Sequence, residues 1–141
     1  MDNVLLVVDD LEAAKTFFID LGLELEGEAV LEGESVDRLI GLDGVRATIA
    51  SMRTPDGHVR IELDKFHAPA AVRVGPDDAP VNALGYRRIM FAVDDIESVL
   101  DRLRRHGAEL VGEVVQYEDQ YRLCYVRGPE GIMIALAQRL A

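Results

Sequence analysis

Apolar and polar positions follow the same order twice along the chain. Residues 7–30, VVDDLEAAKTFFIDLGLELEGEAV, align without a gap with residues 92–115, AVDDIESVLDRLRRHGAELVGEVV, and ten of the twenty-four positions are identical at a constant offset of 85. Self-similarity at a fixed offset is the signature of a duplicated structural unit. The pattern therefore predicts one unit that occurs twice, so that each half can be compared with the other position by position.

Each unit is predicted to begin with a strand that leads into a helix. The run NVLLVV at residues 3–8 is rich in leucine and valine and favours a strand. Two aspartates follow it, and either can cap a helix. Asp9 with Glu12 has the spacing of a capping box, and Asp94 with Glu97 repeats that spacing.

Both helices are predicted to be amphipathic and to end at glycine. Gly22 and Gly107 stand where a left-handed helix end favours glycine. Apolar residues recur before them at helical spacing, as Leu11, Ala14, Phe17, Phe18 and Leu21 in the first half and as Ile96, Val99, Leu100 and Leu103 in the second.

Three strands are expected after each helix, which makes the repeated unit β-α-β-β-β. The turns TPDG at 54–57 and GPEG at 128–131 join the last two strands of each half. Residues 34–44 add a loop or a short helical turn, and residues 67–85, which contain three of the five prolines, are the expected linker. The expected strands are 23–31, 45–53, 58–65, 108–117, 121–127 and 132–138.

The composition is that of a soluble globular chain, with 49% hydrophobic and 29% charged residues among 141. This length fits two half-domains that share one core better than two independent domains. The net charge of -11 and the presence of only two lysines disfavour nucleic acids and anionic membrane surfaces as partners. A small molecule or another protein is the expected partner.

The sequence also predicts a cytoplasmic protein. Its apolar runs are too short to span a bilayer, and the start MDNVLL lacks the basic region of a secretory signal. The single cysteine, Cys124, lies in an expected strand, where a buried, inert thiol is a better interpretation than a nucleophile.

The tandem unit, the aspartate-led helix, the Pro-acid-Gly turn and the closing strands IEL and IAL together resemble the vicinal oxygen chelate superfamily, which includes glyoxalase I, extradiol dioxygenases and bleomycin resistance proteins. The resemblance covers nearly the whole chain. It implies an α+β fold of tandem βαβββ modules, whose curved mixed sheets form an open cup with the helices outside. The modules would be residues 1–66 and 86–141, joined by the linker 67–85, and together they would form one domain and assemble as a homodimer.

Metal-dependent members of that superfamily carry a ligand, commonly His, on the first strand of each module and a Glu on the last. The matching positions in this chain are Asn3 and Arg88 on the first strands, and Glu62 and Ala135 on the last strands. Only Glu62 is a usual ligand, and neither alanine nor a guanidinium can bind a divalent metal. We therefore expect no metal or other known cofactor, although Asn3 and His67, five residues after Glu62, leave a rearranged metal site open.

Strand alternation places Asn3 and Arg88 on the cup side, because the uniformly apolar positions of those strands should face the helices. A buried arginine needs a carboxylate partner or an anionic ligand. Glu62 is the expected partner, either as the organiser of a metal-free site or as half of a purely structural ion pair. If a substrate displaces this pairing, Glu62 would have a raised pKa and act as the catalytic general base.

Other candidates for ligand binding follow from residue chemistry. Tyr121 and Arg122 are a ring and a cation suited to a small-molecule cup, or else ordinary strand residues, and Tyr125 is expected in the core. Among the histidines, only His67 is kept as a site candidate, because His58 follows a turn and His106 lies near the end of a helix.

Three functions remain open. The first is a metal-independent small-molecule-binding or enzyme-like protein with a degenerate metal site. The second is a metal-dependent lyase, isomerase or dioxygenase with substituted ligands. The third is a protein-interaction module that uses the duplicated scaffold only for assembly, which predicts a cup filled by side chains.

Overall fold

The structure is a computed structural model that describes residues 1–140. Contacts between α-carbons divide the chain into two compact units, Met1–Val74 and Gly75–Ala141, and the division falls within the expected linker. Each unit is described by itself below. Among the described residues, no helix is long and apolar enough to cross a membrane.

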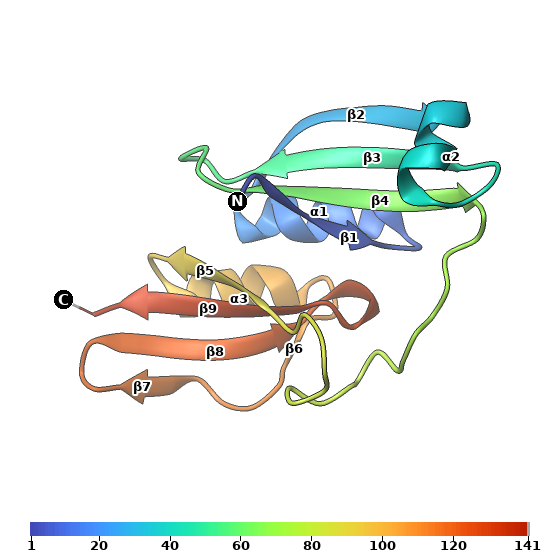
Figure 1. Cartoon of the computed structure of the whole chain (residues 1–141). Coiled ribbons are helices and arrows are strands. Elements are labelled where there is room, and N and C mark those ends of the chain that lie inside the picture. The colour runs from blue at the N-terminus through green and yellow to red at the C-terminus, as the bar shows by residue number, and fades with distance from the viewer. Residues whose placement is uncertain (141) are drawn as a thin grey trace. The chain divides into compact units, whose positions relative to one another are not determined.

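The first unit is a four-stranded mixed sheet with two helices, shown from blue to green in Figure 1. Its strands run in the spatial order β1-β4-β3-β2, with β1 parallel to β4 and the other pairs antiparallel. The elements in chain order are β1 (Asn3–Val7), α1 (Leu11–Leu21), β2 (Glu24–Glu32), α2 (Glu34–Ile40), β3 (Arg46–Arg53) and β4 (Arg60–Ala68).

The second unit repeats this arrangement without α2. Its strands run in the order β5-β9-β8-β6, β7 also pairs with β8, and β5 is parallel to β9. The elements in chain order are β5 (Ile89–Val93), α3 (Ile96–Arg104), β6 (Glu109–Leu110), β7 (Val115–Tyr117), β8 (Tyr121–Arg127), the single 3-10 turn η1 (Pro129–Gly131) and β9 (Met133–Arg139). The predicted β-α-β-β-β repeat is therefore present in both units.

The helices begin one residue later than the capping-box spacing predicts. Asp10 caps α1 by accepting a hydrogen bond from the backbone N–H of Ala13 at 3.0 Å. Asp95 caps α3 by accepting from the backbone N–H of Glu97 at 3.0 Å. The second aspartate of each pair is thus the cap, so the prediction of capping boxes led by Asp9 and Asp94 is wrong. Gly22 closes α1 with a positive φ of 126°, as predicted. In the second unit, α3 ends at Arg104 with Arg105 as its cap, and Gly107 follows two residues later with a positive φ of 78°.

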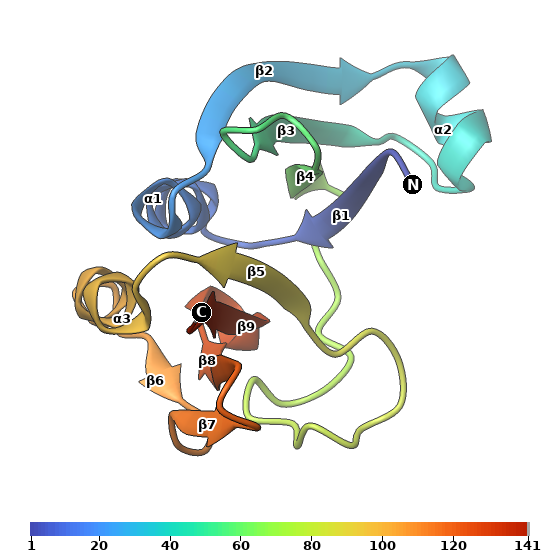
Figure 2. The same ribbon diagram turned by 90° about the vertical axis from the view of Figure 1, so that its left-hand side faces the viewer.

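One face of each sheet is sealed by a helix, α1 on the first sheet and α3 on the second (Figure 2). The predicted apolar helix positions are buried, including Phe17 and Phe18, whose rings meet edge to face at 5.2 Å between centroids. Ile61 and Leu63 of β4 are buried against α1 in the same way. Because strand residues alternate between faces, the residues between them project to the other side.

We call the side of each sheet that carries no long helix its helix-free face. On the β1 and β4 strands of the first sheet this face carries Asn3, Leu5, Val7, Arg60, Glu62 and Asp64. On the second sheet it carries Met90, Ala92, Tyr121, Leu123, Tyr125, Arg127, Met133, Ala135, Ala137 and Arg139, and Arg88, the residue before β5, joins it through Tyr125.

Equivalent residues of the two units take equivalent places in their separate sheets. Leu5 lies beside Glu62 in the first ladder, and Met90, at the offset of 85, lies beside Ala135 in the second. Glu62 and Ala135 are therefore equivalent positions, as the sequence comparison predicts once His58 is treated as an extra residue. The duplication preserved the backbone while the side chains on the helix-free faces changed.

The strand expected at 108–117 is divided into β6 and β7. In the first unit, one extra residue between Leu25 and Gly27 is absorbed as a bulge, and β2 continues. At the equivalent place in the second unit, four residues separate Leu110 from Val115, while only two separate their partners on β8. A second extra residue is more than a simple bulge accommodates, so the ladder is interrupted there.

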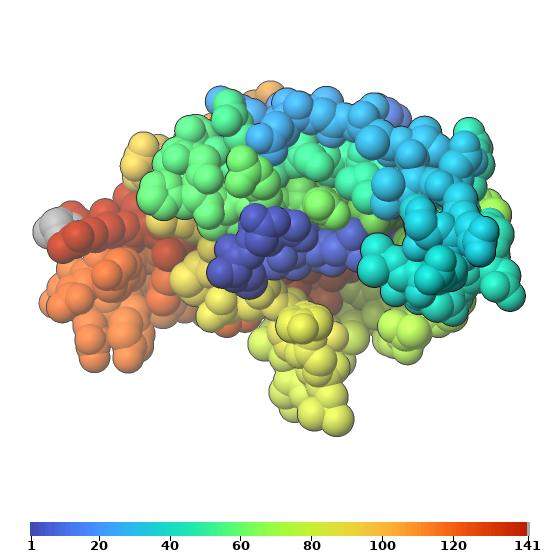
Figure 3. Space-filling view, turned by 45° about the horizontal axis from the view of Figure 1, so that its top comes forward, coloured from blue at the N-terminus to red at the C-terminus, as the bar shows by residue number. Residues whose placement is uncertain are grey.

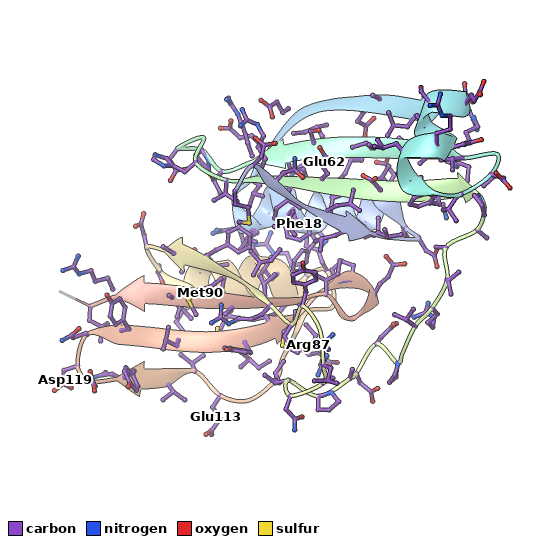
Figure 4. The ribbon with its side chains drawn as sticks, in the orientation of Figure 1. Phe18, Glu62, Arg87, Met90, Glu113 and Asp119 are labelled. Atoms are coloured by element: carbon purple, nitrogen blue, oxygen red, sulfur yellow. The ribbon has the colours of Figure 1, made fainter. Side chains whose placement is uncertain are left out.

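The buried Phe pair gives a test of the core of the first unit. Phe18, labelled in Figure 4, is completely buried, whereas its neighbour Ile19 is 47% exposed. We expect Phe18→Ala to lower the free energy of unfolding by about 3–5 kcal/mol through lost burial and a residual cavity. Ile19→Ala is the control and should cost less than about 1 kcal/mol. Urea unfolding at 25 °C measures both, and equal losses would contradict the assignment of the buried helix face.

Candidate functional site

The helix-free face of the first sheet combines apolar and acidic side chains. Leu5 and Val7 of β1 are exposed there, and the start of β1 lies at the surface in Figure 3. Glu62 and Asp64 lie beside them on β4, and Figure 4 labels Glu62. Asn3 is exposed on this face, where its amide donates to Asp2 at 2.9 Å. The structure therefore brings Asn3 and Glu62 to one face, as the sequence predicts.

Asp64 is the one described charged residue that is buried, with 5% of its surface exposed. One of its carboxylate oxygens, Oδ1, has no hydrogen-bond partner. Burial, together with the negative charge of Glu62, raises the pKa of this carboxyl to about 6. Sequence reasoning missed Asp64, and the available signal was a second acid two residues after Glu62 on the same face of the strand.

On the second sheet, the helix-free face carries a cation held by a tyrosine. The Nε atom of Arg88 donates to the hydroxyl of Tyr125 at 2.8 Å, and the guanidinium carbon lies 5.6 Å from the centre of that ring. Tyr125 is thus half-buried and engaged with Arg88, rather than enclosed in the core as expected. Arg88 belongs to the second unit and Glu62 to the first, so their ion pair stays a prediction.

Tyr121 and Arg122 project to opposite faces of β8. Tyr121 lies on the helix-free face and is 38% exposed. Arg122 turns toward α3, where Nη2 lies 2.6 Å from Oε1 of Glu97 in the first helical turn. This ion pair ties β8 to α3, and Arg122 is not on the face that carries Tyr121.

His67 and Glu62 are separated in the same way. The His67 ring lies 2.7 Å from the hydroxyl of Thr48, on the side of the sheet that carries α1. His67 follows Glu62 by five residues in β4, and strand alternation sends residues an odd number apart to opposite faces. His67 also has no partner in the ladder, at the register shift between Arg46 and Ala47. His67 borders an open hollow of about 570 Å³, which is lined also by Asp9, Glu12, Glu28, Thr48 and Lys65.

The donor groups were tested against a metal site of the kind that the resemblance implies. Within residues 1–140, no three His, Cys, Asp or Glu side chains are grouped so that they could hold a metal ion. Asn3 and Glu62 supply two oxygen donors on one sheet, while Arg88 and Ala135 supply none. Because a structural or catalytic metal needs three or four protein ligands, this set does not fit one.

The comparison with protein families decides the relationship of the chain. The model of the Glyoxalase/Bleomycin resistance protein/Dioxygenase superfamily matches residues 1–136. The chain belongs to this superfamily. The resemblance inferred from the tandem unit is therefore confirmed.

Solved structures place the fold of this superfamily member among glyoxalase-like proteins. A glyoxalase family protein from Bacillus cereus is 56% identical, with a TM-score of 0.95 over 100% of this chain and 94% of that one. Glyoxalase I from Zea mays is 16% identical, with a TM-score of 0.70 over 100% of this chain and 45% of that one. Glyoxalase I from Leishmania major is 17% identical, with a TM-score of 0.64 over 98% of this chain and 85% of that one. Comparison with curated proteins gives no match.

These similarities confirm the predicted fold class, an α+β chain with curved mixed sheets and few helices. The identities with the two glyoxalase I enzymes are low, so those matches support the fold alone. Outside the helix-free faces, Cys124 is buried as predicted, and burial raises the pKa of its thiol, which disfavours the reactive thiolate.

The buried carboxyl of Asp64 predicts how the stability of this superfamily member changes with pH. An unfolded Asp ionises near its ordinary pKa of 3.8, whereas the folded protein retains the proton up to about pH 6. Stability should therefore fall as pH rises from about 4 to about 6, by up to about 3 kcal/mol. Asp64→Asn removes the buried charge that destabilises the folded protein above pH 6. At pH 8 the variant should therefore unfold at a higher urea concentration than the wild type.

The comparison at pH 4 separates this cause from a simple change in packing. There the wild-type carboxyl is neutral, and the advantage of Asp64→Asn should shrink toward zero. Asp43→Asn, in an exposed loop, is the matched control and should not reproduce the gain at pH 8. An Asp64→Asn protein that is less stable than the wild type at both pH values would refute the prediction.

Proposed function

We propose that this protein binds a small organic molecule on its helix-free sheet faces without using a metal ion. Membership of the superfamily supports this proposal, since its named members act on or bind small molecules. The observation that carries it is the set of residues at the four equivalent positions of the two ladders. These are Asn3 and Glu62 in the first unit, and Arg88 and Ala135 in the second.

The chemistry of those four residues argues against a resident metal. Arg88 places a permanent positive charge at a first-strand position, where it would repel a divalent cation. Ala135 has no donor atom at the position that Glu62 occupies in the other unit. Asn3 and Glu62 by themselves would hold a transition metal only weakly.

The same residues suit direct recognition of an organic ligand. In the first unit, an amide and a carboxylate offer hydrogen bonds on the face that carries the exposed Leu5 and Val7. In the second unit, a guanidinium does so on the face that carries Met90 and Tyr121. Fixing a ligand by a few polar groups within an apolar surface is the usual arrangement of small-molecule sites. If the bound molecule is also converted, Glu62 is the residue placed to act as general base.

Metal analysis tests the metal-free part of the proposal. We expect the purified protein to contain far less than one equivalent of nickel, zinc, iron or manganese per chain by mass spectrometry. Dialysis against a chelator should leave the melting temperature unchanged, because a bound metal would stabilise the folded state by mass action. Glu62→Gln is the diagnostic variant: a stoichiometric metal in the wild type that is lost from Glu62→Gln would disprove the proposal.

The binding part is tested separately on chelator-treated protein. A thermal-shift screen against organic acids, amines and neutral aromatic compounds should find ligands that raise the melting temperature, since binding at 100 times Kd stabilises by about 2.7 kcal/mol. Asn3→Ala and Glu62→Gln should weaken the shift, whereas Asp43→Asn should retain it. A protein that responds to no small molecule would instead favour an interaction module. The expected homodimer stays a prediction, which sedimentation would measure.

A further inference from the structure

Arg88 is held in one orientation on the helix-free face of the second sheet. Its Nε atom donates to the hydroxyl of Tyr125 at 2.8 Å, while the guanidinium lies over the same ring at 5.6 Å from its centre. Two contacts with one half-buried side chain limit the rotation of an otherwise flexible arginine. An oriented cation loses less entropy when it binds a ligand than a mobile one does.

The part of the guanidinium that binds anions best remains open. With Nε engaged, Nη1 and Nη2 still offer four N–H donors, and their shared edge matches the two oxygens of a carboxylate. Among residues 75–140, no carboxylate forms an ion pair with Arg88. Arg122 of the same sheet, in contrast, pairs with Glu97 at 2.6 Å. In a chain of 26 acidic residues, Arg88 is thus left unpaired within its unit.

The face around this cation combines apolar side chains of unequal size with a second arginine. Ala135 lies between Met90 and Tyr125 in the ladder, and the next row places Ala137 between Ala92 and Leu123. Ala135 is fully buried, whereas Met90 and Ala92 are exposed and Ala137 is partly exposed, so the accessible apolar surface lies on β5 and at Ala137. Arg127, two residues after Tyr125, donates to the backbone carbonyls of Asp77 and Ala79. Tyr121 adds a partly exposed ring at the edge of this face.

We propose that Arg88 binds the carboxylate of a small organic acid whose apolar body lies against Met90 and Ala92 of β5 and Ala137 of β9. This proposal rests on the proposed function and specifies the class of its ligand. Arg88 is a binding residue, and Tyr125 is a positioning residue that acts through it. A phosphate could contact the same guanidinium edge, so the test includes both anions.

The test uses the full-length, chelator-treated protein and NMR titration. The probes are phenylacetate, hexanoate, the neutral analogue phenylacetamide, phenylphosphate and inorganic phosphate. We expect phenylacetate and hexanoate to shift the backbone amide of Met90 and the Nε–H signal of Arg88. Phenylacetamide should bind at least about tenfold more weakly, because it offers no charge to the guanidinium. Tighter binding of phenylphosphate or phosphate than of phenylacetate would overturn the assignment of a carboxylate.

Variants assign the effect to particular residues. Arg88→Gln should weaken phenylacetate binding at least about tenfold, whereas Arg105→Gln, at an exposed arginine after α3, should bind like the wild type. Tyr125→Phe retains the ring and removes the hydroxyl, so it should weaken binding less and speed solvent exchange of the Arg88 Nε–H. Unchanged affinity in a folded Arg88→Gln protein would refute the proposal.

Glu62→Gln separates this proposal from the ion pair expected from the sequence, because only release from an ion pair would make the variant bind phenylacetate more tightly than the wild type. We expect no gain in affinity, since the guanidinium edge is already open. A tenfold gain would show that Glu62 occupies that edge, and it would overturn the proposal. Binding of neutral probes that does not depend on Arg88 would refute this inference but leave the proposed function intact, whereas binding that requires an added metal would refute the proposed function itself.

Discussion

Each sheet can be sealed on one face only, because each unit has a single long amphipathic helix to cover it. The covered face must be apolar, since a buried charge without a partner costs several kcal/mol. Ile61 and Leu63 fulfil this requirement on β4, and strand alternation then sends Glu62 and Asp64 to the opposite side. In both units, this one constraint separates the apolar residues that pack against the helix from the polar residues on the opposite face.

Both units retain an apolar face that is covered by a helix, whereas the side chains on their helix-free faces differ. The ladders place Leu5 beside Glu62 and Met90 beside Ala135, so the backbone positions are equivalent. Their side chains are not equivalent, because Glu62 has a carboxylate where Ala135 has none, and Asn3 has an amide where Arg88 has a guanidinium.

Asp64 shows that the helix-free face of the first sheet is not optimised for stability. Ionising a buried carboxyl that has an unpaired oxygen lowers the free energy of unfolding, and the raised pKa of Asp64 reflects this loss. Such groups concentrate at functional sites, where stability is given up for chemistry. Its neighbour Glu62 was found from the sequence because it matches a family position, whereas Asp64 matches none.

The sequence by itself determined the duplicated unit, the two amphipathic helices, the strand order along the chain and the superfamily. These features rest on short-range periodicity and on a repeat that the chain itself displays.

Only the tertiary structure decided which aspartate caps each helix, how large the bulge after Leu110 is and that Tyr125 holds Arg88. It also decided that His67 contacts Thr48 and that Arg122 pairs with Glu97. These features depend on register between strands, where one extra residue moves a side chain to the other face. Register is set by contacts between residues far apart in the chain, which periodicity within a strand does not record.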